Sequence, residues 1–307
     1  MSPTAPDDLV APVIDAHLHV WDPGRLTYDW LRDEPALHRR FGPEDLDLGG
    51  VDVAGIVFVQ ADCRADQAVA EVDWIRGLAN GGAPVIGPPI LGIVAQAPLE
   101  LGAGCSEQLA SYAADPLVVG VRRLLQDEPA GFALAPGFVE GVRLLGGLAL
   151  SFDLCVRWHQ LDEVAELVER CPEVRFVLDH LGKPPVRAGA YSAWAERLTR
   201  VAERPNVSCK LSGLATEADP EQLTAAVLRP YLDHALAAFG ADRCLFGSDW
   251  PVATTAVTYR AWHDLVVDAC TGLRTADRER VLGGTARSVY GLPSGSLSDA
   301  GPGGEGG

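Results

Sequence analysis

The sequence predicts an α/β fold of a single domain, a (β/α)8 TIM barrel. Short β-branched runs alternate with longer stretches of helical periodicity through most of the 307 residues. One unit follows another about every 25 to 40 residues, and no linker rich in Pro, Gly or Ser interrupts them before the C-terminal tail. A doubly wound sheet is the alternative, but no Gly-x-Gly-x-x-Gly sequence follows the first predicted strand. Eight units in about 290 residues therefore favour the barrel.

Eight runs have the apolar, β-branched character of strands that helices cover on both faces. They are residues 13–20, 55–60, 90–95, 118–125, 150–157, 174–179, 206–211 and 244–247. The helix-period stretches between and after them are residues 66–78, 107–114, 138–145, 161–169, 191–201, 222–239, 259–270 and 277–290. We expect residues 1–11 to be a lead-in, residues 12–293 to form the barrel and the Gly-rich residues 294–307 to be a disordered tail.

The composition limits the partners and the compartment of the protein. A formal net charge of −17 argues against binding to nucleic acid or to an anionic membrane. Residues 1–10 lack the basic start and apolar centre of a signal peptide, and no run reaches the roughly 18 apolar residues that span a bilayer. Seven scattered cysteines without Cys-x-x-Cys spacing favour reduced, buried thiols. We therefore expect a cytoplasmic protein, and a homo-oligomer is compatible with this composition.

Barrel enzymes carry their chemistry at the carboxyl ends of the strands, so polar residues there are candidates for the site. His17 and His19 lie two residues apart on the first predicted strand, where alternate side chains face the same side. Two imidazoles on one side can bind a metal ion or polarise a carbonyl oxygen. The ends of the later strands add Gln60, Asp62, Arg122, Arg123, Gln126, His159, Asp179, His180, Lys183, Lys210, Ser212 and Asp249.

Each candidate also has a structural interpretation. His17 and His19 could be structural, His159 could cap the helix that begins near residue 161, and His180 could be a hydrogen-bonded turn residue. Asp249 could cap a turn, although burial beside a tryptophan would be costly without a partner. Of the two adjacent arginines only one can face the barrel mouth, and we expect Arg122 to do so.

Other catalytic classes lack their motifs. The chain has no Gly-x-Ser-x-Gly elbow, no Walker loop, and no cysteine with an evident histidine partner. What remains is hydrolysis, with water as the nucleophile, Asp249 as the general base, and the histidines, with or without a metal ion, as the electrophile.

The paired histidines of the first strand, the histidines after the fifth and sixth strands and the aspartate after the eighth together resemble the amidohydrolase superfamily. Longer segments resemble its amidohydrolase-related group, which contains lactonases of L-fucono- and L-rhamnonolactone, over roughly residues 12 to 292. These segments are DAHLHVWDP (15–23), GVRRLLQDEP (120–129), FVLDHLGKP (176–184), CKLSGL (209–214) and LFGSDWP (245–251).

The resemblance implies a hydrolase that opens a small lactone by attack of water on the ring carbonyl. Asp249 would be the base, and His17, His19 and His180 would polarise the carbonyl. Contacts to the substrate would come from Trp21, Gln60, Arg122, Gln126, Lys183 and Trp250. Some members hold one Zn or Mn ion, here through His17, His19, His159 and Asp249, whereas others hydrolyse lactones without a metal, so both alternatives stay open.

Two departures from the group's pattern concern the substrate. Arg123 stands where many members have His, and Arg157-Trp158-His159 replaces a commoner aromatic-Pro-His. An additional arginine at the mouth favours a carboxylated lactone. The alternative functions are a metal-dependent decarboxylase of an unsaturated acid and a catalytically idle barrel that binds a small molecule; His19 and Asp249, whose loss would mark an idle protein, are both present.

Overall fold

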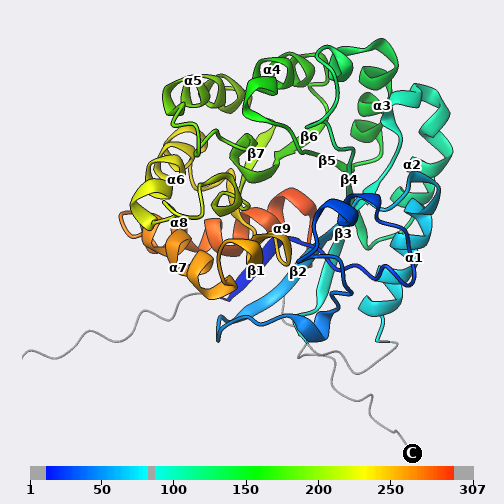
Figure 1. Ribbon diagram of the computed structural model, residues 1–307. Coiled ribbons are helices and arrows are strands. Elements are labelled where there is room, and N and C mark those ends of the chain that lie inside the picture. Colours follow the sequence, from blue (N-terminus) through cyan, green and yellow to red (C-terminus); the bar gives the residue numbers. More distant parts are fainter. Residues whose placement is uncertain (1–11, 82–86, 294–307) are drawn as a thin grey trace, which may run out of the picture.

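The computed structural model describes residues 12–81 and 87–293, and parallel strands in the order β1 to β8 form its centre (Figure 1). The strands are β1 (Val13–Leu18), β2 (Val53–Val59), β3 (Ile90–Gln96), β4 (Val118–Arg122), β5 (Ser151–Leu154), β6 (Arg175–Leu178), β7 (Val207–Leu211) and β8 (Cys244–Phe246). Each neighbouring pair is parallel. All eight predicted strands are present, and the barrel prediction is confirmed.

Helices surround the strands on the outside (Figure 1). They are α1 (Ala68–Ala79), α2 (Ser106–Ala113), α3 (Pro136–Gly147), α4 (Leu161–Arg170), α5 (Tyr191–Ala202), α6 (Ala225–Phe239), α7 (Tyr259–Ala269), α8 (Thr275–Glu279) and α9 (Thr285–Tyr290). The amphipathic pattern explains their placement: in α4 the apolar side chains at 161, 164, 165, 167 and 168 are buried, and the acidic ones face outward.

One predicted helix differs from the structure. Residues 277–290 are not one α-helix, because a π-helical turn, Arg280–Gly284, separates α8 from α9. A Cβ atom on Gly283 would lie 3.2 Å from Cγ1 of Ile14 on β1. The glycine therefore lets the turn pack closely against the first strand, a local requirement that helical periodicity does not reveal.

The strands bury apolar side chains in two separate clusters. The larger lies between the sheet and the helices and includes Phe152, Phe176 and Leu211. The smaller cluster contains side chains from β1, β2, β3, β6 and β8, together with Tyr290 and Leu292. Because these strands lie far apart around the sheet, their side chains can meet only in the barrel interior. The interior is therefore a packed core and not a channel.

The barrel closes between its first strand and the segment that follows its last one. The backbone N–H of Asp249 donates to the carbonyl of His17 at 2.8 Å, and that of His19 donates to the carbonyl of Trp250 at 2.8 Å. Below these bonds, Oδ1 of Asp15 accepts from the N–H groups of His17, at 3.1 Å, and Ser248, at 2.9 Å. This closing seam, residues 15–19 and 248–250, brings together residues that are far apart in the sequence.

The remaining predictions about the whole chain are tested only in part. The predicted lead-in, 1–11, and the predicted tail, 294–307, lie outside the described residues. In the described ranges no helix combines the length and apolar character that crossing a membrane requires. All seven cysteines are buried and free, in agreement with the prediction of reduced thiols.

Candidate active site

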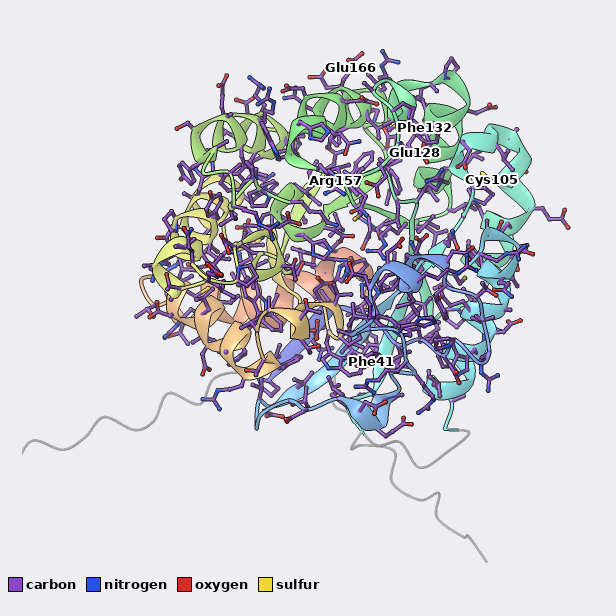
Figure 2. All side chains as sticks on the ribbon, viewed as in Figure 1. Phe41, Cys105, Glu128, Phe132, Arg157 and Glu166 are labelled. Carbon is purple, nitrogen blue, oxygen red and sulfur yellow. The ribbon has the colours of Figure 1, made fainter. Side chains whose placement is uncertain are left out.

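A cavity of about 450 Å³ opens at the carboxyl ends of the strands. Residues that follow β1, β2, β4, β5, β6, β7 and β8 line it. In the view of Figure 2, Phe41 of the β1–β2 connection and Arg157 of the β5–α4 connection lie on opposite sides of the barrel. The strands themselves end early at this side, β4 at Arg122 and β5 at Leu154, because the chain leaves the sheet to form the cavity wall.

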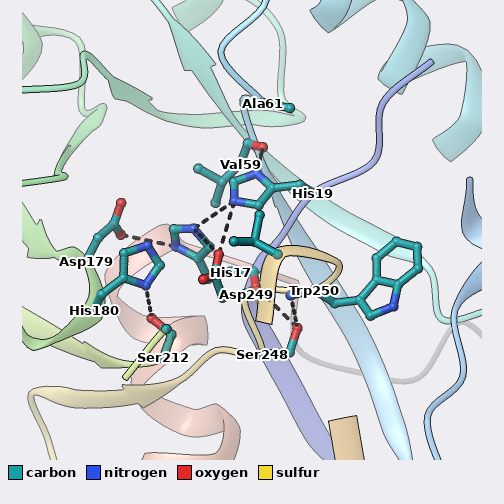
Figure 3. A network of polar contacts seen from close by, with 12 residues as sticks. His17, His19, Val59, Ala61, Asp179, His180, Ser212, Ser248, Asp249 and Trp250 are labelled. Carbon is teal, nitrogen blue, oxygen red and sulfur yellow. Dashed lines mark hydrogen bonds and ion pairs between the residues drawn. The ribbon is translucent and has the colours of Figure 1, made fainter. Parts of the chain in front are cut away.

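His17, His19 and Asp249 meet at the closing seam (Figure 3). The Nε2 atoms of the two histidines are 3.1 Å apart, and Oδ1 of Asp249 is 3.7 Å from that of His17 and 3.5 Å from that of His19. All three residues are buried, and His19 and Asp249 line the cavity. The sequence prediction that these three residues converge is therefore correct in geometry.

Hydrogen bonds orient the two imidazoles. Nδ1 of His19 lies 2.7 Å from the carbonyl oxygen of Val59, which can only accept, so Nδ1 carries the proton and Nε2 presents a lone pair. Nδ1 of His17 lies 3.2 Å from Oδ1 of Asp179 and 3.1 Å from Nζ of Lys210. A proton on Nδ1 of His17 would leave a second lone pair on Nε2, 3.1 Å from that of His19, whereas acceptance by Nδ1 from Lys210 would place the proton on Nε2, between the two rings.

Two lone pairs that face each other repel unless a cation or a proton lies between them. Tetrahedral zinc with nitrogen ligands at about 2.05 Å requires ligand atoms about 3.3 Å apart. The separations of 3.1, 3.5 and 3.7 Å among the ligand atoms of His17, His19 and Asp249 are close to this value. These residues therefore fit a single divalent ion, and His17 with Asp179 and His180 forms a second group of suitable spacing.

The Asp249 carboxylate is held in its ionised form. Burial alone would raise its pKa, but His180, His19 and His17 outweigh burial and hold the pKa well below the usual range. Asp249 is thus a carboxylate at neutral pH, able to bind a cation or to take a proton from water.

His180 stands on an unusual turn after β6. His180, Leu181 and Lys183 all have left-handed backbone angles, with φ of 54°, 55° and 47°, and Gly182 between them has a φ of 69°. Nδ1 of His180 lies 2.9 Å from Oγ of Ser212, and its ring centroid is 4.4 Å from that of His17. Burial lowers the pKa of His180 to about 4, so its imidazole is neutral at neutral pH. The turn presents His180 to the cavity.

Beneath the histidines lies a buried polar layer, in which three candidates from the sequence meet Asp153, a residue that the sequence analysis did not single out. Nζ of Lys210 is 2.6 Å from Oδ2 of Asp153 and 3.0 Å from Oδ1 of Asp179. Nη1 of Arg122 is 3.2 Å from Oδ2 of Asp179 and 3.4 Å from Nε2 of His17. Two carboxylates and two cations thus balance in charge, and Lys210, His17 and Arg122 hold the pKa of Asp179 far below its usual value despite its burial. The signal in the sequence was Asp153, a charged residue inside an otherwise buried strand.

Of the predicted substrate contacts, four line the cavity and two do not. Trp21, Arg122, Gln126 and Lys183 are part of the wall. Gln60 is fully buried, and its Oε1 accepts from the N–H of Asp62 at 2.5 Å. The ring of Trp250 points away from the histidines and packs against Phe41 (Figure 3). Asp249, the residue before Trp250, has a left-handed φ of 60°, and its carboxylate faces the histidines while the Trp250 ring does not.

The position of His159 differs from the prediction, and the contacts of Arg123 do not support a carboxylated substrate. His159 is exposed on a short 3-10 turn before α4 and belongs to neither potential metal group, because β5 ends five residues earlier. Arg123 turns outward, as expected, where it pairs with Glu100 and Glu128 and its guanidinium lies 5.2 Å from the ring of Phe132. Glu128 and Phe132 lie close together in Figure 2. Arg123 therefore does not supply the cationic mouth residue that would favour a carboxylated lactone.

Several wall residues were not predicted as site residues. The β1–β2 connection contributes Trp30, Glu34 and Leu37, which join Asp62, a candidate from the sequence, in the wall. The connection from Leu18 to Val53 is long for a barrel loop, and its length was the available signal.

Comparison with known proteins identifies the family. The amidohydrolase family model matches residues 14–292. The chain belongs to this family. An L-fucono-1,5-lactonase of Burkholderia ambifaria is 33% identical over 305 residues, which cover 92% of this chain and 97% of the relative. A protein of the same name from Burkholderia multivorans is 34% identical over 295 residues, 91% of this chain and 96% of the relative.

Solved structures agree with this assignment. A Burkholderia multivorans amidohydrolase with bound zinc is 31% identical and superimposes with a TM-score of 0.80, covering 92% of this chain and all of that chain. A 2,6-dihydroxybenzoate decarboxylase from Rhizobium is 16% identical with a TM-score of 0.57, covering 91% of this chain and 98% of that chain. At such low identity the decarboxylase shows a shared fold alone.

Proposed function

We propose that this member of the amidohydrolase family is a lactonase, which hydrolyses the cyclic ester of a small hydroxy acid. The observation that carries the proposal is the position of the Asp249 carboxylate in the wall of the cavity, with Oδ1 3.7 Å from Nε2 of His17 and 3.5 Å from Nε2 of His19. The two Burkholderia relatives, named as L-fucono-1,5-lactonases and matched over nearly their whole length, support an aldonolactone as substrate.

In the proposed reaction, Asp249 takes a proton from water as the oxygen attacks the ring carbonyl. The protonated Asp249 then returns the proton to the ring oxygen as the acyl–oxygen bond breaks, and the hydroxy acid leaves. A weakly basic carboxylate suffices because a lactone is an ester strained by its ring and its carbonyl is readily attacked.

The neighbouring groups stabilise the charge that develops on the carbonyl oxygen. If the Ser212 hydroxyl donates to Nδ1 of His180, the proton of this neutral ring is on Nε2 and can be donated to that oxygen. His17, His19 and Asp249 would hold a divalent ion of the zinc or manganese type, as their spacing and the zinc-containing relative suggest. Such an ion supplies electrophilic activation of the carbonyl or of the water.

An assay with a panel of aldonolactones and carboxylated lactones tests this function. Each ring opening at neutral pH releases one proton, which a pH indicator records. We expect turnover of at least one aldonolactone and none of unsaturated carboxylic acids. Evolution of CO2 from such acids, with every lactone unchanged, would replace the lactonase by a decarboxylase.

A further inference from the structure

The charged groups of the cavity wall are mostly engaged within the protein. Nη2 of Arg122 donates to the carbonyl oxygen of Gln60 at 2.5 Å, and its Nη1 faces Asp179. The Nε atom of Arg122 has no partner but is enclosed by protein. Nζ of Lys183 donates to Oε1 of Gln126. The Arg122 guanidinium is therefore engaged within the protein, whereas the Lys183 ammonium uses one of its three N–H donors for its neutral partner Gln126.

The carboxylates of the cavity wall differ from one another in their partners and in their exposure to solvent. Asp249 faces the histidines, Asp127 pairs with Arg157 at 2.9 Å, and Glu34 is exposed to solvent. Asp62 alone among them is largely enclosed and, within the described part of the chain, has no hydrogen bond or ion pair from its side chain. Asp62 is thus the enclosed carboxylate of the wall that is free to accept hydrogen bonds from a ligand.

The backbone holds Asp62 in place. Its φ of 59° lies in the left-handed region, which aspartate and asparagine tolerate better than other residues with a side chain. Its N–H donates to the buried Oε1 of Gln60 at 2.5 Å. The position of the carboxylate in the wall is therefore set before a ligand arrives.

Burial raises the pKa of Asp62 although the charges of Arg122 and Arg123 oppose the shift, and an enclosed carboxylate without a hydrogen-bond donor is costly. A ligand hydroxyl that donates to it would remove part of that cost, whereas a ligand carboxylate at the same place would add repulsion between like charges. Sites that carry such unpaired polar groups discriminate strongly against ligands without the matching donor.

We propose that Asp62 is a specificity-determining residue, which accepts hydrogen bonds from hydroxyl groups of a polyhydroxylated lactone and excludes lactones with a carboxylate at that position. This inference rests on the proposed lactonase function. It replaces the expectation, based on Arg123, of a carboxylated substrate.

The test compares Asp62→Asn with Asp66→Asn. Asparagine keeps the shape and the left-handed preference of residue 62 but removes its charge. Asp66 is exposed, lies four residues further along the same segment outside the cavity wall and pairs with Arg64, so its variant removes the same charge without changing the wall. Steady-state kinetics are measured on the best hydroxylated aldonolactone and on a carboxylated lactone of similar ring size, and Tm is measured for each protein.

For Asp62→Asn we expect KM for the hydroxylated lactone to rise about tenfold or more, as for the loss of a charge-assisted hydrogen bond, with kcat within about threefold. The ratio of kcat/KM for the carboxylated to the hydroxylated lactone should rise by at least the same factor. Tm should stay equal or increase, because a costly charge is removed; a purely structural residue would lower it. Asp66→Asn should match the parent protein.

An unchanged KM and an unchanged substrate ratio in Asp62→Asn, in a protein whose parent opens hydroxylated lactones, would overturn the role of Asp62 and leave the lactonase function in place. A parent protein that hydrolyses no lactone would overturn both. A parent protein that prefers the carboxylated lactone would overturn the inference alone.

Discussion

Asp249 adopts a left-handed backbone conformation, with a φ of 60°, directly after the last strand of the barrel. This conformation directs its carboxylate back toward His17 and His19 while its N–H remains bonded to the His17 carbonyl. Strain of about 1–3 kcal/mol at such a residue persists where the surrounding contacts determine it, and it is commonly found at functional sites. Here the contacts of the closing seam determine it.

Asp249→Asn tests the role of this carboxylate. We expect kcat to fall by about two to four orders of magnitude, because general-base catalysis contributes about 10²–10⁴ and the amide cannot take the proton. Far-UV and near-UV circular dichroism should match the parent protein, since asparagine tolerates the same backbone angles. Activity within threefold of the parent would remove Asp249 from the mechanism.

Glu71 on α1 is a buried carboxyl group behind the cavity wall. Its Oε1 accepts from the hydroxyl of Tyr28 and from the N–H of Ala61, both at 3.3 Å. Burial raises its pKa from the usual 4.5 to about 7 despite these bonds. A raised pKa means that the folded state binds the proton more tightly, so this group contributes stability below pH 4.5 that is lost as the pH rises through about 7.

Glu71→Gln should therefore remove a pH-dependent loss of stability. The amide keeps an acceptor for Tyr28 and Ala61 but cannot ionise. We expect the Tm of the variant relative to the parent to increase between pH 4.5 and pH 7 and then to level off. Thermal unfolding in one buffer series measures this, with pH 4.5 as the internal control. A Tm difference that does not depend on pH would show that Glu71 has the same pKa in the folded and unfolded states.

At the scale of elements, two connections meet over the site: the left-handed turn after β6, which carries His180, and the turn after β7, which contains Gly213. Gly213 has a φ of 58°, and a Cβ atom there would lie 2.4 Å from Nδ1 of His180 and 3.0 Å from Oδ2 of Asp249. Glycine is required because the His180 and Asp249 side chains occupy the space of its missing side chain.

Gly213→Ala should lower kcat/KM at least tenfold, because the methyl group displaces His180 and Asp249. Gly189→Ala is the matched control: its φ is 65°, so the backbone cost is similar, but nothing lies within 4 Å of the added Cβ. We expect both variants to lose stability and only Gly213→Ala to lose activity. Equal kinetics of the two variants would show that the methyl group at 213 is accommodated.

The elements were largely predictable from the sequence, because periodicity and β-branching report burial, which the barrel imposes on every strand. His17, His19, His180 and Asp249 could be found because barrels place polar residues at strand ends. The direction in which each side chain points was harder to predict from the sequence. Gln60 lies one residue beyond β2 and Trp250 one residue beyond Asp249, and one residue decides between the cavity and the protein interior.

Contacts that depend on three-dimensional closure could not be predicted. Lys210 was noted at a strand end, but its contacts with Asp153 and Asp179 cross the barrel interior. His159 lies only five residues beyond β5, yet a 3-10 turn places it in solvent. The role of Asp62 depends on which neighbouring charges are already paired, and no sequence pattern shows this.

At the scale of the whole molecule, the residues that fit a metal ion also close the barrel. An ion held by His17, His19 and Asp249 would join the first strand to the segment after the last one, so its binding should stabilise the entire fold. Stability and metal content would then be coupled in this protein.

Zinc titration of chelator-treated protein measures this coupling. We expect Tm to rise by several degrees with added zinc or manganese, since an ion at about 100 times its Kd contributes about 2.7 kcal/mol, and lactonase activity to return with it. His19→Ala, which lacks one ligand, should show little increase. Fully active protein with well under a tenth of an equivalent of metal and no Tm response would show that the histidines act through their own N–H groups.

The closing seam also sets the order in which the site can arise during synthesis. His19 and Asp249 are 230 residues apart (249 − 19), and at about 5–20 residues per second a ribosome needs roughly 10 to 50 s to travel from one to the other. Throughout that interval the paired histidines exist without their carboxylate, and β1 has β2 beside it but no partner on its other edge. Catalytic competence therefore appears only after the last strand has been made, and turnover reports that the ring of strands is complete.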